Sequence, residues 1–137
     1  MRVRPAEAED FPRILRLAAS RDLDYPDMEN DGFFLAEDER GLQGIVGLKR
    51  HPDGLELCAL GVEPAAEGRG IGRALVEALS ASVSEDLFLA TIIPGFFEKC
   101  GFRTIADGPD FIKEKKASGW CEGCPSDRCT VMVRQSR

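Results

Sequence analysis

The sequence contains no apolar run that approaches the roughly 20 residues needed to cross a membrane, and residues 1–7 lack the apolar region of a signal peptide. Positive charge is also in deficit, because 18 Lys and Arg stand against 24 Asp and Glu, for a net charge of −6. A nucleic-acid binder needs clustered Lys and Arg on its surface, so that class is disfavoured. We therefore expect a soluble cytoplasmic protein that binds neither nucleic acid nor a membrane.

The five cysteines are an odd number and follow no secretory signal. We interpret them as thiols or metal ligands instead of a disulfide framework. No internal repeat divides the 137 residues, and a chain of this length can bury one proper core. The sequence therefore predicts a single domain over residues 1–137.

Hydrophobic periodicity predicts a mixed arrangement of strands and helices. Asp53-Gly54 is a strong hairpin signal, because both residues tolerate positive φ, and it places two strands in an antiparallel meander. The run at 87–93 is apolar almost throughout, as expected of a strand buried on both faces. We predict strands at 1–4, 32–37, 42–50, 55–62, 87–93, 102–106 and 130–133, helices at 11–18, 70–84 and 96–100, the last capped by Gly101, and a loop or helical turn at 109–117.

A glycine-rich turn within residues 62–75 joins one of these strands to a helix. Gly68, Gly70 and Gly72 leave the backbone uncrowded, so successive N–H groups can converge on an anion at the positive end of the helix. The turn therefore has the properties of a phosphate cradle.

Two familiar phosphate loops do not fit this turn. A P-loop requires a lysine followed by a hydroxyl residue, and the turn has neither. The third glycine of a dinucleotide fingerprint would fall on Arg73 or Leu75. Nucleotide hydrolysis and Rossmann redox chemistry are both disfavoured.

The turn does resemble the diphosphate loop of the GCN5-related N-acetyltransferases (GNAT), in which Arg/Gln-x-x-Gly-x-Gly/Ala opens a helix after a strand of the form Leu-x-Val-x-Pro. Gly70 and Gly72 match the loop. Leu60, Val62 and Pro64 match the strand. The strand and loop residues occur in the same order as in the family, so the resemblance is more specific than the glycines alone would make it.

The resemblance extends over most of the chain and includes Phe-Phe-Glu-Lys-Cys-Gly-Phe at 96–102. One departure is that Glu67 stands where the family has Arg or Gln. Backbone N–H groups supply most donors in such a loop, so an acidic side chain that points to solvent is tolerated. Arg69 or Arg73 could supply positive charge.

The resemblance implies the GNAT fold, which is an α+β fold with a central mixed, largely antiparallel sheet, splayed parallel fourth and fifth strands, and flanking helices. It implies acetyl-CoA as co-substrate, with pantetheine between the strands at 55–62 and 87–92. The cofactor-binding residues that it implies are Leu60, Gly61, Val62, Glu67, Gly68, Arg69, Gly70, Ile71, Gly72, Arg73 and Phe97.

The resemblance also implies catalytic roles for Glu56 and Val62. Glu56 occupies the position of a glutamate that draws a proton from the amine, and the alternative is a solvated or ion-paired glutamate near the hairpin. The Val62 N–H would donate to the thioester carbonyl. Strand alternation puts Glu56, Cys58, Leu60 and Val62 on one face, barring a bulge. We interpret His51, beside the turn, as a surface histidine.

The general acid of the family is often a tyrosine at the position of Phe97. The only tyrosine here, Tyr25, lies in an early acidic segment. Either water protonates the departing thiolate, or Cys100 or another group does so.

The end of the chain, with Trp-Cys-Glu-Gly-Cys-Pro at 120–125, resembles the tail of the short, N-acetylglutamate synthase-like amino-acid acetyltransferases. Glutamate or a related amino acid is thus the leading acceptor. The Cys-rich loop at 120–129 precedes the last strand and supplies three soft ligands, one short of a closed zinc site. We favour reduced cysteines that pack the tail over zinc or a redox pair; the three cysteines are Cys121, Cys124 and Cys129.

A glutamate acceptor needs cations for its carboxylates, which Lys49 and Arg50 could supply at the end of a strand near the expected cleft. The expected partner is a small-molecule amine, and the sequence leaves open whether the chain forms a homodimer. Two alternatives remain, an acetyltransferase for a protein or another amine, and a catalytically weak acyl-CoA-binding sensor. A solvated charge cluster accounts better for Lys113, Lys115 and Lys116.

Overall fold

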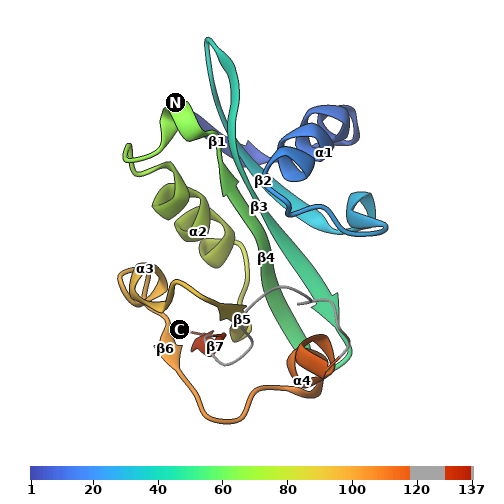
Figure 1. The fold of residues 1–137 in the computed structure, drawn as a ribbon, viewed down its shortest axis with the longest axis vertical. Coiled ribbons are helices and arrows are strands. Elements are labelled where there is room, and N and C mark those ends of the chain that lie inside the picture. Colours follow the sequence, from blue (N-terminus) through green and yellow to red (C-terminus); the bar gives the residue numbers. More distant parts are fainter. Residues whose placement is uncertain (118–128, 137) are drawn as a thin grey trace. The chain divides into compact units, whose positions relative to one another are not determined.

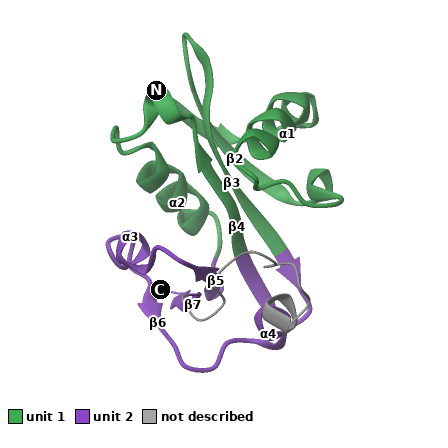
Figure 2. Cartoon of the chain, viewed as in Figure 1, with its two compact units in different colours: residues 1–49, 57–83 green, residues 50–56, 84–137 purple. Residues whose placement is uncertain are grey.

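The computed structural model describes residues 1–117 and 129–136, with the side chains of 114–117 left out. It divides into two compact units (Figure 2). Unit 1 comprises Met1–Lys49 and Leu57–Val83, and unit 2 comprises Arg50–Glu56 and Ser84–Arg137. The predicted cysteine-rich loop at 120–129 lies outside the described residues, apart from Cys129.

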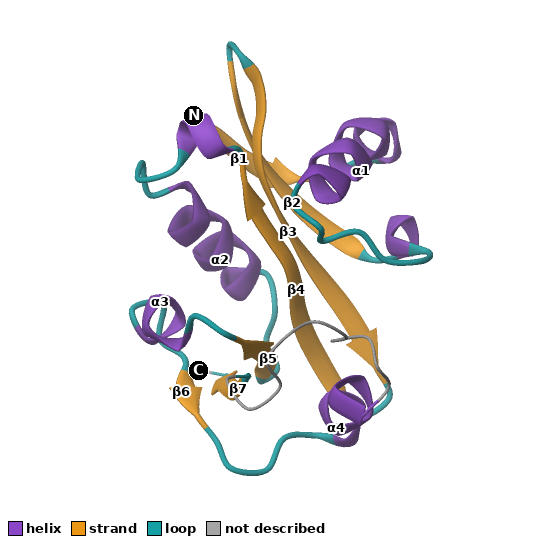
Figure 3. Ribbon diagram, viewed as in Figure 1, coloured by secondary structure: helices purple, strands orange, loops and turns teal. Residues whose placement is uncertain are grey.

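The elements form a mixed α+β structure (Figure 3). In the described residues, seven strands follow the order β1-β2-β3-β4-β5-β7-β6. The pairs β1–β2, β2–β3, β5–β7 and β6–β7 are antiparallel, and β4 pairs with β5 in parallel. The predicted GNAT fold class, with its parallel fourth and fifth strands, is confirmed. The strands are β1 Arg2–Pro5, β2 Gly32–Asp38, β3 Gly41–His51, β4 Gly54–Val62, β5 Leu87–Thr91, β6 Arg103–Thr104 and β7 Thr130–Arg134; the helices are α1 Phe11–Ser20, α2 Ile71–Ala81, α3 Pro94–Glu98 and α4 Asp110–Ala117.

In unit 1, helices α1 and α2 cover opposite faces of the strands (Figure 1). The face under α1 buries a cluster that β2 and β3 share with the helix. On the other face, a Cβ added to Gly44 would meet Leu75 of α2 at 2.9 Å, so the helix lies directly on β3. The α1 cluster consists of Ile14, Leu17, Ala18, Met28, Phe33, Leu35 and Ile45.

In unit 2, strand β5 ends earlier than the sequence predicts. The prediction of a doubly buried strand through Ile93 is wrong, because β5 stops at Thr91 and both Ile92 and Ile93 are exposed. The reason is local: the Ile93 N–H donates to the Thr91 hydroxyl, and Pro94 then begins α3. Leu87 and Leu89 supply the buried face of the strand.

The end of α3 follows the prediction for Gly101. Its backbone has φ of +90°, and its N–H donates to the Glu98 carbonyl, while the Phe102 N–H donates to the Phe97 carbonyl. These two bonds satisfy carbonyls at the helix end that would otherwise have no hydrogen-bond donor.

The segment predicted as a loop or helical turn at 109–117 is helix α4, whose Phe111 packs on the hairpin turn at Gly54. Within residues 1–117 and 129–136, no helix is both long and apolar enough to span a membrane.

Candidate active site

The glycine turn of unit 1 forms an open anion cradle at the start of α2. Gly68 and Gly70 have φ of +81° and +78°, and Gly70 is the N-cap residue of the helix. Beyond the residues adjacent to each glycine and the backbone of the helix, no described atom lies within 4 Å of a Cβ built on Gly68 or Gly70. No side-chain hydrogen bond caps the helix. The first N–H groups of a helix have no partner within it. An anion is stabilised at this end of a helix.

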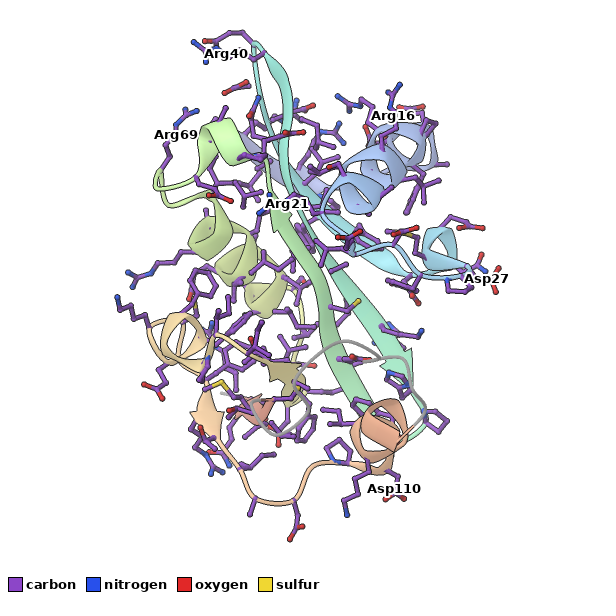
Figure 4. The ribbon with its side chains drawn as sticks, in the orientation of Figure 1. Arg16, Arg21, Asp27, Arg40, Arg69 and Asp110 are labelled. Carbon is purple, nitrogen blue, oxygen red and sulfur yellow. The ribbon has the colours of Figure 1, made fainter. Side chains whose placement is uncertain are left out.

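Two ion pairs flank this cradle. Nη2 of Arg21 lies 2.9 Å from Oε1 of Glu67, and Nη1 of Arg69 lies 3.8 Å from Oδ2 of Asp38. Asp38 also accepts from the side chain of Gln43. Glu67 is thus paired with an arginine from the end of α1, which the sequence analysis did not foresee. Figure 4 shows Arg21 beside β4 and Arg69 pointing outward from the loop.

The strand before the cradle is interrupted at Ala59, whose φ is +50°. Left-handed backbone at a residue with a Cβ is unusual and breaks the period-two alternation. The prediction of one face from Glu56 to Val62 assumed a strand without a bulge, and the irregular Ala59 lies between Cys58 and Leu60. Leu60 and Val62 are half-buried.

The remaining predicted cofactor residues of unit 1 lie at the end of β4 and the start of α2. Gly61 lies under Leu23, where an added Cβ would come within 2.6 Å of the leucine. Ile71 is buried on the inner face of α2, whereas Gly72 is half-buried and Arg73 is exposed.

The two remaining predicted site residues, Glu56 and Phe97, belong to unit 2. The Glu56 side chain is 4% exposed, and Nε2 of His51 lies 2.9 Å from its Oε1. The His51 ring stacks on Phe111 at a centroid distance of 3.9 Å. The interpretation of His51 as a surface histidine is therefore wrong, because it is a partly buried partner of Glu56. Glu56 is therefore paired near the hairpin and not solvated, which fits the ion-paired alternative as well as a catalytic role.

The signal for this pair was present in the sequence. A tight hairpin at Pro52 and Asp53 makes His51 and Glu56 diagonal neighbours on one face. Diagonal side chains on a strand pair are within reach of a long or aromatic residue.

A polar group in unit 1 surrounds Tyr25. Its hydroxyl donates to Oδ2 of Asp31 at 2.7 Å and lies 3.5 Å from Sγ of Cys58. Nζ of Lys49 lies 4.7 Å from the centroid of the ring. Burial, and then the neighbouring Cys58 and Asp31, raise the pKa of the Tyr25 phenol well above its usual value. No role for Tyr25 followed from the sequence, and the fold brings it beside Cys58 of β4.

Phe97 is buried, with its ring centroid 5.0 Å from that of Phe96 and 5.6 Å from that of Phe102. Cys100, named above as one candidate proton donor, is also buried, and its carbonyl accepts from Arg134. Among the described residues, no group of three or more potential ligands is arranged to hold a metal ion. Cys121 and Cys124 lie outside them.

A family model described as the acetyltransferase (GNAT) domain matches residues 29–104, more than half of the chain. The match includes β2 to β6, the glycine cradle, Glu56 and Phe97.

Solved structures share this fold. Rv2747 of Mycobacterium tuberculosis, crystallised with CoA, has a TM-score of 0.77 and 22% identity over 100% of both chains. N-acetylglutamate synthase of Neisseria gonorrhoeae, complexed with coenzyme A and N-acetyl-glutamate, has a TM-score of 0.77 and 20% identity. That match covers 100% of this chain but 36% of the synthase. An aminoglycoside 6'-acetyltransferase of type Ii has a TM-score of 0.67 and 22% identity over 98% of this chain and 97% of its own.

Proposed function

The chain belongs to the GNAT acetyltransferase family, and we propose on this premise that it transfers the acetyl group of acetyl-CoA to the amine of a free amino acid such as glutamate. The observation that carries the proposal is the open cradle at the start of α2, where Gly68 and Gly70 leave room for an anion. Helix N-termini stabilise phosphate groups. CoA therefore fits this cradle through its diphosphate.

The cofactor site that we propose runs along the end of β4 into α2. Leu60, Gly61 and Val62 offer backbone groups to pantetheine, and the Val62 N–H is the proposed donor to the thioester carbonyl. The diphosphate lies against the N–H groups of the glycine turn. The family resemblance adds Phe97 to the proposed cofactor residues. The turn residues are Glu67, Gly68, Arg69, Gly70, Ile71, Gly72 and Arg73.

Glu56 is the proposed general base. The amine nitrogen forms a bond to the acetyl carbon, the carbon–sulfur bond breaks, and the proton of the amine passes to the Glu56 carboxylate, directly or through water. The sulfur leaves as a thiolate, and water protonates it. The bond from His51 fixes the orientation of the carboxylate.

Lys49 is the proposed cation for the acceptor carboxylate. It lies over the Tyr25 ring, and the Tyr25 hydroxyl reaches Cys58, the residue before the irregular Ala59 of β4. A cation beside this strand suits an acceptor that carries a carboxylate in addition to its amine. The similarity to a synthase complexed with N-acetyl-glutamate supports glutamate as the first acceptor to test.

The test of the acceptor is a comparison of turnover among glutamate, glutamine, a polyamine and a peptide panel. We expect glutamate to be the best substrate, and we expect Lys49→Ala to raise its KM while kcat changes less. A preference for peptides or aminoglycosides, with Lys49→Ala without effect, would defeat the amino-acid acceptor and leave acetyl transfer itself standing.

One observation favours a second candidate, a weakly catalytic acyl-CoA-binding module. Phe97 has no hydroxyl with which to protonate a thiolate, and it is buried. Such a module would bind CoA without turnover of any amine. A homodimer and a cytoplasmic location remain predictions from the sequence.

A further inference from the structure

The anion cradle contains a carboxylate, which is an unusual neighbour for a diphosphate. Glu67 directly precedes Gly68 in the turn, and its side chain is 56% exposed. Like charges at short range oppose each other, so an unpaired Glu67 would weaken the binding of any anion in the cradle. The structure pairs it with Arg21, whose Nη2 lies 2.9 Å from Oε1.

Arg21 is held in place by its backbone. Its N–H donates to the Ala18 carbonyl at 3.1 Å, and the Leu23 N–H donates to the same carbonyl at 2.8 Å. Asp22 between them has φ of +56°, which closes the end of α1 in a tight turn. The backbone position from which the Arg21 side chain extends is therefore fixed.

The stem of Arg21 passes close to the strand that feeds the cradle. Its Cβ and Cγ lie 3.9 Å from the position of a Cβ built on Gly61. A larger residue at 61 would also collide with Leu23 at 2.6 Å, so glycine permits this close approach. From here the guanidinium reaches across to the turn (Figure 4).

Stability does not account for this pair. Both side chains are more than a third exposed, and exposed ion pairs contribute little to folding free energy. The pair instead fixes the position of the positive charge of Arg21 beside the glycine turn. A guanidinium has five donors, so one edge can bind Glu67 while others bind a phosphate oxygen.

We propose that Arg21 supplies the cation of the CoA diphosphate site and that Glu67 positions it there. This rests on the proposed function, because it concerns the same CoA site. Arg69 is directed differently, toward Asp38 and outward from the loop. The charge that the family carries within the loop is thus provided in this chain from the end of α1.

The test measures CoA affinity by calorimetry on the full chain, for the wild type, Arg21→Ala, Glu67→Gln and the double variant. We expect Arg21→Ala to weaken CoA about tenfold or more, as for a lost charge-assisted bond. Glu67→Gln should change affinity less, and the double variant should recover only the part of the loss that comes from the unpaired Glu67 carboxylate. Arg16→Ala, on the exposed face of α1, is the matched control and should bind as the wild type does.

Recovery of wild-type affinity in the double variant would overturn the proposal, because Arg21 would then act only by neutralising Glu67. The probe 3'-dephospho-CoA keeps the diphosphate, so the loss in Arg21→Ala should persist with it; disappearance of the loss would refute the diphosphate contact. The kcat/KM for S-acetylpantetheine, which has no diphosphate, should be unchanged. Wild-type protein that binds no CoA would instead refute the proposed function, and wild-type affinity in Arg21→Ala would refute only the role of Arg21.

Discussion

Nε2 of His51 lies 2.9 Å from Oε1 of Glu56, at the hairpin that joins β3 to β4. The carboxylate is almost fully buried, whereas the imidazole is 19% exposed and stacked on Phe111. A buried carboxylate that is hydrogen-bonded to an imidazole has a fixed orientation, as a general base requires. The family resemblance assigns the base to Glu56, and His51 is the residue that positions it.

Replacement of Glu56 by Gln should lower kcat by about 10²- to 10⁴-fold, the usual contribution of a positioned general base. The remaining rate should rise with pH, because it then depends on the amine that is already neutral in solution. The measurement is a pH profile of thiol release from acetyl-CoA. An unchanged rate and profile would remove Glu56 from the role of base.

Replacement of His51 by Asn should lower kcat about tenfold, since a hydrogen bond to a charged group contributes about 1.5 kcal/mol. The KM for acetyl-CoA should not change, because His51 acts through Glu56. Asp53→Asn in the same turn is the matched control, as Asp53 is exposed and Asn-Gly also suits a hairpin. If His51→Asn loses no more activity than Asp53→Asn, the histidine does not position the base.

Replacement by glycine should have opposite effects on the free energy of unfolding at Ala59 and at Ala19. Because Ala59 has φ of +50°, Ala59→Gly should relieve strain and raise the free energy of unfolding by up to about 1 kcal/mol. Ala19 is exposed in α1, so Ala19→Gly should lower it by roughly 0.5–1 kcal/mol. Urea unfolding measures both. Destabilisation of similar size in the two variants would contradict left-handed backbone at Ala59.

Stability toward acid should depend on Asp10. Asp10 accepts two hydrogen bonds from Arg4, one from the Glu7 backbone N–H and one from Arg13. These bonds hold the pKa of Asp10 well below its usual range. A carboxyl with a lowered folded-state pKa stabilises the fold above its unfolded pKa of about 3.9, and this contribution is lost as the pH falls below that value. Asp10→Asn should therefore lower stability at pH 7 and flatten its decline below about pH 4. An equally steep decline in the variant would show that Asp10 is not responsible.

Much of the fold follows from local signals in the sequence. The turn residues at Asp53 and Gly54 set the hairpin, and the glycines before α2 set the cradle. Alanine at position 59 gives no such signal, because left-handed backbone there is imposed by packing and not by the residue. The early end of β5 was missed because Ile92 and Ile93 are apolar although they lie in a turn.

The partners in the candidate site were harder to foresee than its backbone. Arg21 and Glu67 are 46 residues apart, and Tyr25 and Cys58 are 33 apart. Contacts of this kind depend on how α1 and its following segment pack on the strands, which periodicity does not specify. His51 and Glu56 are the exception, because they are five residues apart across a predicted hairpin.

Acetyl transfer to glutamate is tested most directly by measuring thiol release from acetyl-CoA by the wild-type chain with glutamate, with the product identified by mass spectrometry. We expect CoA and N-acetyl-glutamate to appear in equal amounts, at a rate that falls in Glu56→Gln. Binding of CoA with no acetylated product from glutamate, other amino acids, polyamines or peptides would contradict it.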